Sequence, residues 1–94
     1  MPTIRFDESF RKSVRKFSKN NINRKNSIKK TLLLFQENPK HPSLNTEKLT
    51  GTQIWTIRVD KGNRLFFTWA ETDNTAIFFF VGPHDTYKTI KNKH

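Results

Sequence analysis

The chain has 94 residues, with 18 Lys and Arg, 8 Asp and Glu, a formal net charge of +10 and no cysteine. This length favours one compact domain over residues 1–94 and excludes a deep cleft between two lobes. The lack of cysteine excludes disulfides, cysteine-ligated zinc and thiol catalysis, and the basic charge favours a polyanionic partner.

The sequence shows neither a membrane helix nor a signal peptide. Its longest apolar run, residues 76–81, is far shorter than the roughly 20 residues that a membrane-spanning helix needs. Arg5, Asp7 and Glu8 stand where a signal peptide has its apolar segment. We therefore expect a cytoplasmic protein that does not associate with membranes.

The start of the chain is basic and predicts a short strand followed by a helix. Its first thirty residues hold ten Lys and Arg but only two acidic residues. Residues 2–6 can form the strand, and Asp7 is typical of a helix N-cap. Phe10, Val14 and Phe17 recur at spacings of four and three, which predicts a helix with one apolar stripe.

A second helix is predicted over residues 23–38. Pro39 ends it, because the residue before a proline is disfavoured in the helical region. The side chains expected to form its apolar side are Ile28, Leu32, Leu33, Leu34 and Phe35. Two short helices joined by a few residues are expected to run antiparallel.

A β-hairpin is predicted after residue 53, where the hydrophobic period changes to two. A three-residue loop over residues 60–62, with Gly62 left-handed, keeps the apolar residues of both strands on one face. This register pairs Ile57 with Leu65 and Trp55 with Phe67. It also places Arg58 directly opposite Arg64.

The remaining elements are a buried strand and a short C-terminal helix. Residues 76–81 are apolar on both faces, so we expect this strand at the centre of the sheet. Asp85 is a plausible cap for the helix that follows Gly82 and Pro83. The fold class is therefore α+β: two N-terminal helices packed on a twisted, mostly antiparallel sheet of about four strands, with a short C-terminal helix.

The arginine pair is the main candidate for chemistry. Like charges in opposed positions destabilise a sheet, whereas a phosphate between two guanidiniums matches their fork geometry. Phe66 lies on the same face as Arg58 and Arg64 and offers a ring on which a base can stack. The alternative is that the two arginine stems splay apart and cover a solvated face.

Four further residues are weaker candidates. His84 follows the last strand and can exchange protons near neutral pH, and Tyr87 lies one helical turn further on. Glu47 and Lys48 can serve as a base and a phosphate clamp, or they are an ordinary exposed pair. No spacing of histidines and carboxylates predicts a metal site, and we expect no cofactor.

Five segments in this order resemble the RelE/ParE superfamily of bacterial toxins from type II toxin–antitoxin pairs. The segments are His-Pro-Ser-Leu (41–44), Lys-Leu-Thr-Gly (48–51), Ile-Trp-Thr-Ile-Arg-Val (54–59), Asn-Arg-Leu-Phe-Phe (63–67) and Val-Gly-Pro-His-Asp-Thr-Tyr (81–87). The resemblance covers nearly the whole chain. It implies the RelE-like fold, which agrees with the layout predicted above from the hydrophobic pattern.

The RNA-cleaving branch of this family implies a ribosome-associated mRNA endoribonuclease that needs no metal. By that resemblance Arg64 stabilises the transition state, Arg58 binds a neighbouring phosphate, and His84 is the general acid or base. Tyr87 resembles the aromatic residue that orients the substrate, and Glu47 matches a position where relatives carry a base or a basic residue. The residues expected to bind RNA are Lys48, Phe66, Arg11, Arg15 and Lys16.

The implied partners are mRNA, the ribosome and a cognate antitoxin protein with an acidic or amphipathic segment. Two other functions remain open at this point. One is inhibition of DNA gyrase, as in the ParE branch. The other is nucleic-acid binding without catalysis.

Overall fold

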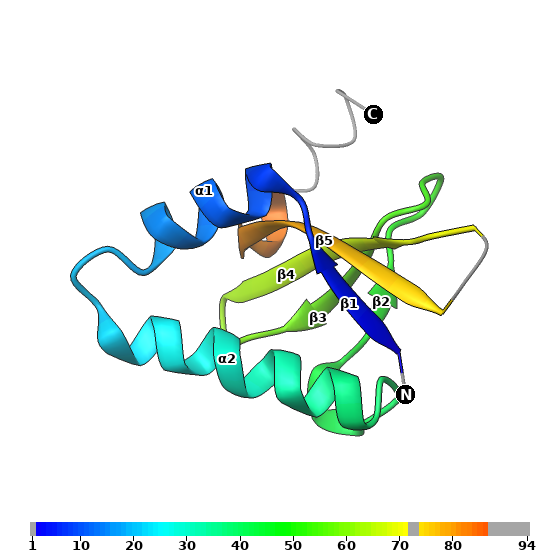
Figure 1. The fold of residues 1–94 in the computed structure, drawn as a ribbon, viewed down its shortest axis with the longest axis horizontal. Helices are drawn as coiled ribbons and strands as arrows, with labels where there is room; N and C mark the ends of the chain where they lie inside the picture. The colour runs from blue at the N-terminus through cyan, green and yellow to red at the C-terminus, as the bar shows by residue number, and fades with distance from the viewer. Residues whose placement is uncertain (1, 72–73, 87–94) are drawn as a thin grey trace.

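The computed structural model describes residues 2–71 and 74–86 and contains two α-helices against a five-stranded mixed sheet of order β1-β5-β4-β3-β2 (Figure 1). The main elements are β1 (Thr3–Phe6), α1 (Glu8–Phe17), α2 (Ile22–Glu37), β2 (Glu47–Lys48), β3 (Trp55–Arg58), β4 (Asn63–Trp69) and β5 (Thr75–Pro83). Two 3-10 helices are η1 (Pro42–Leu44) and η2 (His84–Thr86). In the described part of the chain, neither α-helix is long and apolar enough to cross a membrane.

The predicted first strand and first helix are confirmed. Asp7 is the N-cap of α1, and its Oδ1 accepts a hydrogen bond from the Ser9 amide at 3.2 Å. Phe10 is buried, stacks on Phe6 with 5.2 Å between ring centroids, and meets Phe78 of β5 at 5.9 Å. The apolar stripe of α1 therefore faces the sheet.

The second helix is also confirmed, but its apolar side is narrower than predicted. Phe35 is fully buried, and its ring centroid lies 5.1 Å from Phe67 and 5.5 Å from Phe78. Leu33 is 64% exposed, so its expected place in the core is wrong. Residues two apart on a helix do not share a face, so Leu33 points away from the side that buries Phe35.

Figure 1 shows α1 and α2 running in opposite directions and joined by a short turn, as expected. Asn20 in that turn is left-handed, with φ 57°, which is one of the few conformations that asparagine tolerates better than most residues. Side chains of both helices and of one face of the sheet form a single core. Its buried members are Phe10, Ile28, Phe35, Leu44, Ile57, Leu65, Phe67, Ala76, Phe78 and Val81.

The sheet differs from the prediction in two respects. It has five strands rather than about four, because β2 is only two residues long and too short to show a period. The central strand is β4, since β1 pairs in parallel only with β5 and leaves β5 second from the edge. The three other pairings are antiparallel, as expected. Of the predicted C-terminal helix, only η2 falls within the described residues.

The hairpin register is confirmed, but the loop is built differently. Ile57 pairs with Leu65, and Arg58 pairs with Arg64. The expected left-handed Gly62 is wrong, because Gly51 is the one glycine with positive φ in the described ranges. Instead Oδ1 of Asp60 accepts hydrogen bonds from the amides of Gly62 and Asn63, each at 3.0 Å. An aspartate that binds backbone amides ahead of it closes a turn without a left-handed glycine.

Two serines of α1 complete the edge of β5 beyond the end of β1. The Ser9 hydroxyl donates to the carbonyl oxygen of Phe79 at 3.1 Å. The Ser13 hydroxyl donates to the carbonyl oxygen of Val81 at 3.0 Å and accepts from the Val81 amide at 2.9 Å. Helix α1 thus takes over the hydrogen bonding that a strand would supply, and the sheet stays paired up to the candidate site.

We expect Ser13→Ala to lower the free energy of unfolding by about 1–3 kcal/mol, because it leaves both backbone groups of the buried Val81 unpaired. Urea unfolding at 25 °C measures the change. Ser9→Ala is the matched control: it removes one bond at an exposed position and is expected to cost less than about 1 kcal/mol. Equal losses in the two variants would contradict this account of the edge.

Candidate active site

Two arginines meet on the face of the sheet that the helices leave uncovered. Arg58 ends β3, Arg64 is the second residue of β4, and the two are direct register partners. Arg58 is exposed, whereas Arg64 is 8% exposed. Only one member of the pair is therefore free to move in solvent.

The guanidinium of Arg64 is held at one nitrogen. Its Nη1 donates to Oγ1 of Thr56 at 2.7 Å and to the carbonyl oxygen of Asn45 at 3.0 Å. The same nitrogen lies 4.0 Å from Oε2 of Glu47, whose side chain is about half exposed. Burial lowers the pKa of Arg64, Glu47 raises it and Arg58 lowers it further. An arginine with a lowered pKa is still a cation at neutral pH.

The His-Pro-Ser-Leu segment explains how the Asn45 carbonyl comes to face Arg64. His41 caps η1, with its Nδ1 accepting from the Ser43 amide at 3.1 Å. Leu44 is 1% exposed and anchors the turn in the core. Asn45 then adopts a left-handed conformation, φ 48° and ψ 50°, which turns the chain toward β2. The motif is thus a structural turn that delivers a backbone acceptor to the site.

A hollow of about 200 Å³ lies beside the arginine pair. Its lining residues come from the β3–β4 loop, the strand ends and the η1 turn: Asn45, Arg58, Asp60, Lys61, Gly62, Asn63 and Arg64. Three of these side chains are cationic and one is anionic. The arrangement suits a phosphate, which pairs with a guanidinium through two parallel hydrogen bonds.

The backbone of His84 lies at the same end of the sheet as Arg64. Arg64 pairs with Gly82 and Asn63 pairs with Pro83, and His84 begins η2 directly afterwards. This places the backbone of residue 84 next to the register partners of Asn63 and Arg64, and the role of His84 in the site stays a prediction. Tyr87 lies outside the described residues.

Phe66 does not offer the exposed ring that was expected for base stacking. It is fully buried in a second, smaller core with Leu49 and Ile54. A bulge between Phe66 and Phe67 lets two residues of β5, Phe79 and Phe80, pack against its ring at 6.4 and 5.6 Å. A ring covered in this way has no face left for a base.

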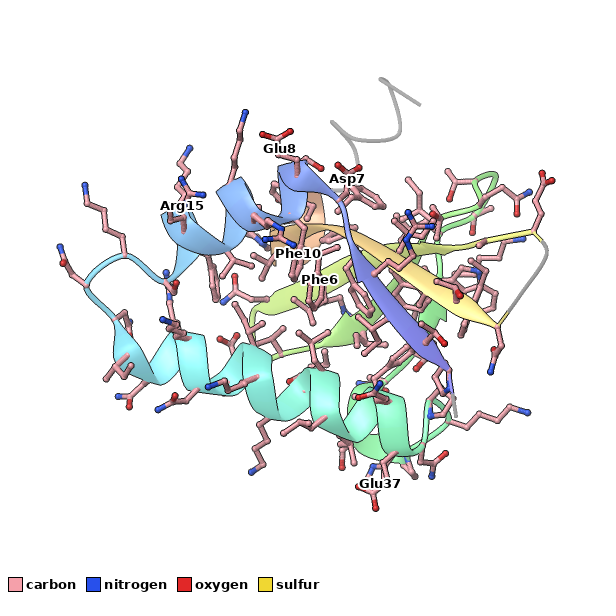
Figure 2. All side chains as sticks on the ribbon, in the orientation of Figure 1. Phe6, Asp7, Glu8, Phe10, Arg15 and Glu37 are labelled. Carbon is pink, nitrogen blue, oxygen red and sulfur yellow. The ribbon has the colours of Figure 1, made fainter. Side chains whose placement is uncertain are left out.

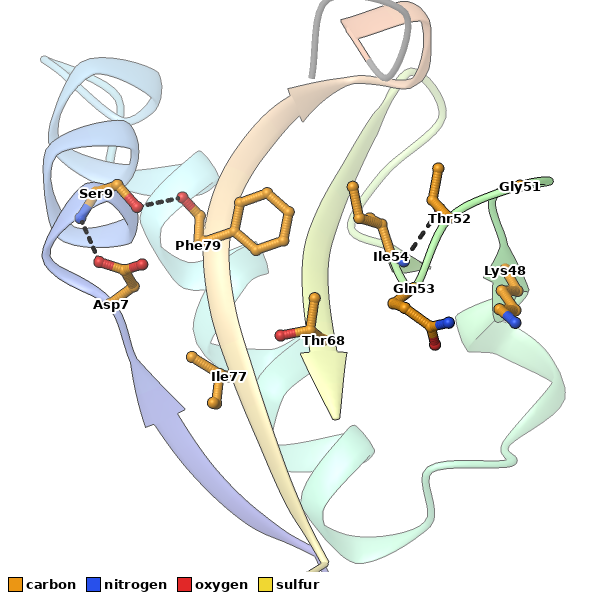
Figure 3. Close-up of a pocket in the computed structure, with 10 residues that line it drawn as sticks. All are labelled: Asp7, Ser9, Lys48, Gly51, Thr52, Gln53, Ile54, Thr68, Ile77 and Phe79. Carbon is orange, nitrogen blue, oxygen red and sulfur yellow. Dashed lines mark hydrogen bonds between the residues drawn. The ribbon is translucent and has the colours of Figure 1, made fainter. Parts of the chain in front are cut away.

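A larger cavity, about 990 Å³, lies further along the same face and does not include the arginine pair (Figure 3). Ile54, Ile77 and Phe79 form its apolar part, and Lys48 and Gln53 lie at its β2 side. Lys48 is exposed, and it follows Glu47 directly on β2. The structure therefore places Lys48 beside the cavity and Glu47 beside Arg64.

The other predicted RNA-binding residues lie on α1, outside both cavities. Arg11, Arg15 and Lys16 are exposed, and Figure 2 shows Arg15 directed away from the sheet. None of the three lines the hollow beside the arginine pair, and Lys16 lines a different hollow with Gly82 and Pro83 of β5. Within residues 2–71 and 74–86, no three His, Asp or Glu side chains form a group that could hold a metal ion.

Sequence reasoning missed Thr56 and Asn45, the two residues that hold Arg64. Thr56 occupies the polar position of an alternating strand, where a threonine is unremarkable. Asn45 carried a usable signal, because asparagine after a short turn favours the left-handed conformation. For neither residue does the sequence predict that its acceptor oxygen contacts an arginine on another strand.

Solved structures that share this architecture include toxins. No family model matches the sequence, and a comparison with the curated proteins gives no match. The chain superposes on a YoeB/ParE toxin from Agrobacterium tumefaciens with a TM-score of 0.72 at 12% identity, covering 87% of this chain and 98% of that one. The values for YafQ from E. coli are 0.68 at 18% identity, covering 93% and 98%.

The toxin–antitoxin complex RelBE of E. coli provides a third match. Its TM-score is 0.61 at 23% identity, covering 88% of this chain and 96% of that one. All three matches span nearly the whole of the other chain, so no large insertion or missing element separates the folds. The chain therefore has the fold of the RelE/ParE superfamily of toxins.

Proposed function

We propose that this protein is the toxin of a type II toxin–antitoxin pair and that it inhibits translation by cutting mRNA on the ribosome. One observation carries the proposal. On a RelE-like fold, a nearly buried guanidinium is held rigidly beside a second, exposed arginine at the rim of an open hollow. Burying a cation is costly, so a site that does so favours an anionic substrate.

The proposed reaction is an in-line attack within the RNA strand. The ribose 2′-oxygen forms a bond to the adjacent phosphorus, the bond from phosphorus to the 5′-oxygen breaks, and a 2′,3′-cyclic phosphate and a 5′-hydroxyl result. Arg64 and Arg58 stabilise the extra negative charge of the phosphorane, since fixed donors act most strongly where charge develops. His84 protonates the leaving oxygen, and Glu47, beside Arg64, accepts the 2′-hydroxyl proton.

Further residues bind the rest of the substrate in this proposal. Tyr87 orients the substrate, and Lys48 binds a phosphate that lies along the open face. The basic surface of α1 (Arg11, Arg15 and Lys16) docks on ribosomal RNA. Phe66 is not proposed to bind RNA, because its ring is fully buried and cannot contact a base.

The proposed partner in the resting state is an antitoxin with an acidic or amphipathic segment. The RelBE structure is of a toxin–antitoxin complex, and this chain shares its fold. A net charge of +10 favours an acidic segment, because complementary charge speeds association and selects the partner.

We expect Arg64→Ala and His84→Ala each to abolish growth arrest on induction while the protein stays folded. Loss of a general acid or base lowers a rate by about 10²–10⁴-fold. Growth curves and circular dichroism measure toxicity and folding. Arg5→Ala, which removes an exposed arginine of β1, is the control and is expected to stay toxic. Full toxicity of both site variants would contradict the site assignment.

Brief induction followed by mapping of mRNA 5′ ends separates the two branches of the family. We expect new 5′-hydroxyl ends inside translated codons, because the 5′-oxygen leaves phosphorus and is protonated to a hydroxyl. Host DNA is expected to stay intact. Unbroken mRNA together with DNA breaks would instead identify a gyrase inhibitor. Binding to RNA with neither kind of break would identify a non-catalytic module.

The basic surface of α1 is expected to account for much of the salt dependence of ribosome binding. In the triple variant Arg11→Gln, Arg15→Gln, Lys16→Gln, the slope of log K against log[salt] should fall by about 0.7–0.9 for each phosphate that the protein no longer neutralises. Binding to ribosomes is measured over a salt titration from about 50 to about 200 mM KCl. The matched control neutralises three exposed lysines of α2 (Lys25, Lys29 and Lys30), and a larger change there would overturn the assignment of α1.

A further inference from the structure

Thr56 is a buried polar residue to which the proposed reaction gives no part. It is fully buried on β3 and pairs with Phe66 of β4. Its hydroxyl oxygen accepts the shortest hydrogen bond that Arg64 makes, at 2.7 Å. Valine has the same shape but no hydroxyl, so it would leave one hydrogen of the nearly buried Arg64 guanidinium without its acceptor.

Of the three guanidinium nitrogens of Arg64, only Nη1 donates hydrogen bonds to the described residues. Nη1 carries two hydrogens, and its acceptors are Thr56 Oγ1 and the Asn45 carbonyl oxygen. In the described part of the chain, Nη2 and Nε donate no hydrogen bond to the protein. They nevertheless reach solvent, because no buried side-chain nitrogen among the described residues lacks a partner.

A guanidinium is planar, so two acceptors on one nitrogen fix the direction of the other two nitrogens. The acceptors come from separate parts of the chain, the middle of β3 and the left-handed turn at Asn45. Arg64 also lines the hollow beside Arg58. The edge formed by Nη2 and Nε is therefore the one available to an anion, and this edge makes the two-bond contact with phosphate.

We propose that Thr56 is a positioning residue: together with the Asn45 carbonyl it orients Arg64 so that Nη2 and Nε face the reacting phosphate. This inference rests on the proposed RNA cleavage for its effect on rate. It predicts that the hydroxyl matters for the transition state rather than for binding RNA, because remote contacts bind the rest of the strand. A misplacement of about 1 Å in such a contact can cost about 10²-fold in rate.

The test compares Thr56→Val, which removes the hydroxyl and keeps the shape, with Thr56→Ser, which keeps the hydroxyl. On mRNA bound to purified ribosomes we expect kcat of Thr56→Val to fall by about 10–100-fold with little change in KM, and Thr56→Ser to recover most of the loss. Thr75→Val is the matched control, since Thr75 is a buried strand threonine at the far end of β5. A normal kcat in Thr56→Val, or no recovery in Thr56→Ser, would overturn the proposal.

A double-mutant cycle distinguishes positioning from a general structural effect. In an Arg64→Ala background, Thr56→Val should cause no further loss of kcat, because the group that it orients is gone. Equal losses in both backgrounds would show that Thr56 acts independently of Arg64, which contradicts the proposal. Unfolding midpoints of all variants are measured alongside.

A second readout does not depend on cleavage. In nitrogen-15 NMR spectra, the Nη1 hydrogens of Arg64 should be protected from exchange in the wild type and in Thr56→Ser, and unprotected in Thr56→Val. If the wild type shows this protection but does not cut RNA, the proposed function fails while the orientation of Arg64 stands. If the protection is equal in Thr56→Val, the positioning role fails whether or not RNA is cut.

Discussion

The register of the β3–β4 hairpin is the constraint on which the rest of the molecule depends. Side chains alternate between the two faces of a strand, so a slip of one residue would move Ile57 and Leu65 out of the core and the arginines into it. The cost of exposing the apolar face under α2 therefore also fixes Arg58 opposite Arg64. The arrangement of two like charges, unfavourable in itself, is imposed by the packing of the opposite face.

The two faces of the sheet are covered by different elements. Both helices cover one face, and α1 also completes the edge of β5 through Ser9 and Ser13. The other face has no helix over it in the described part of the chain, and the β5 bulge closes only its middle with Phe66, Phe79 and Phe80. Open space remains on either side of these rings, at the arginine pair and at the larger cavity. The phenylalanine-rich strand thus separates two surfaces.

Most of the features that the sequence predicted correctly depend on residues that are close together in the chain. The N-cap at Asp7, the helix at 22–37 and the Arg58–Arg64 pairing all result from residues close in the chain or from one two-fold period. The predictions for Leu33 and Phe66 are wrong because their surroundings come from distant parts of the chain, whereas the prediction for Gly62 is wrong because of a local contact with the Asp60 side chain. Leu33 is exposed because nothing in the described part of the chain packs on its side of α2. The Asp60 side chain closes the loop at Gly62. The bulge in β5 brings two phenylalanines over the Phe66 ring.

The sequence by itself determined the α+β class, the order of the elements, the hairpin register and the pair of arginines at its end. Periodicity and turn chemistry are local, and they suffice for these features. Only the tertiary structure decided which arginine is buried, what holds it and where the open surfaces lie. Thr56, Asn45 and Glu47 approach Arg64 from β3, a turn and β2. Their meeting depends on how strands and turns assemble in space, which no single segment of the chain encodes.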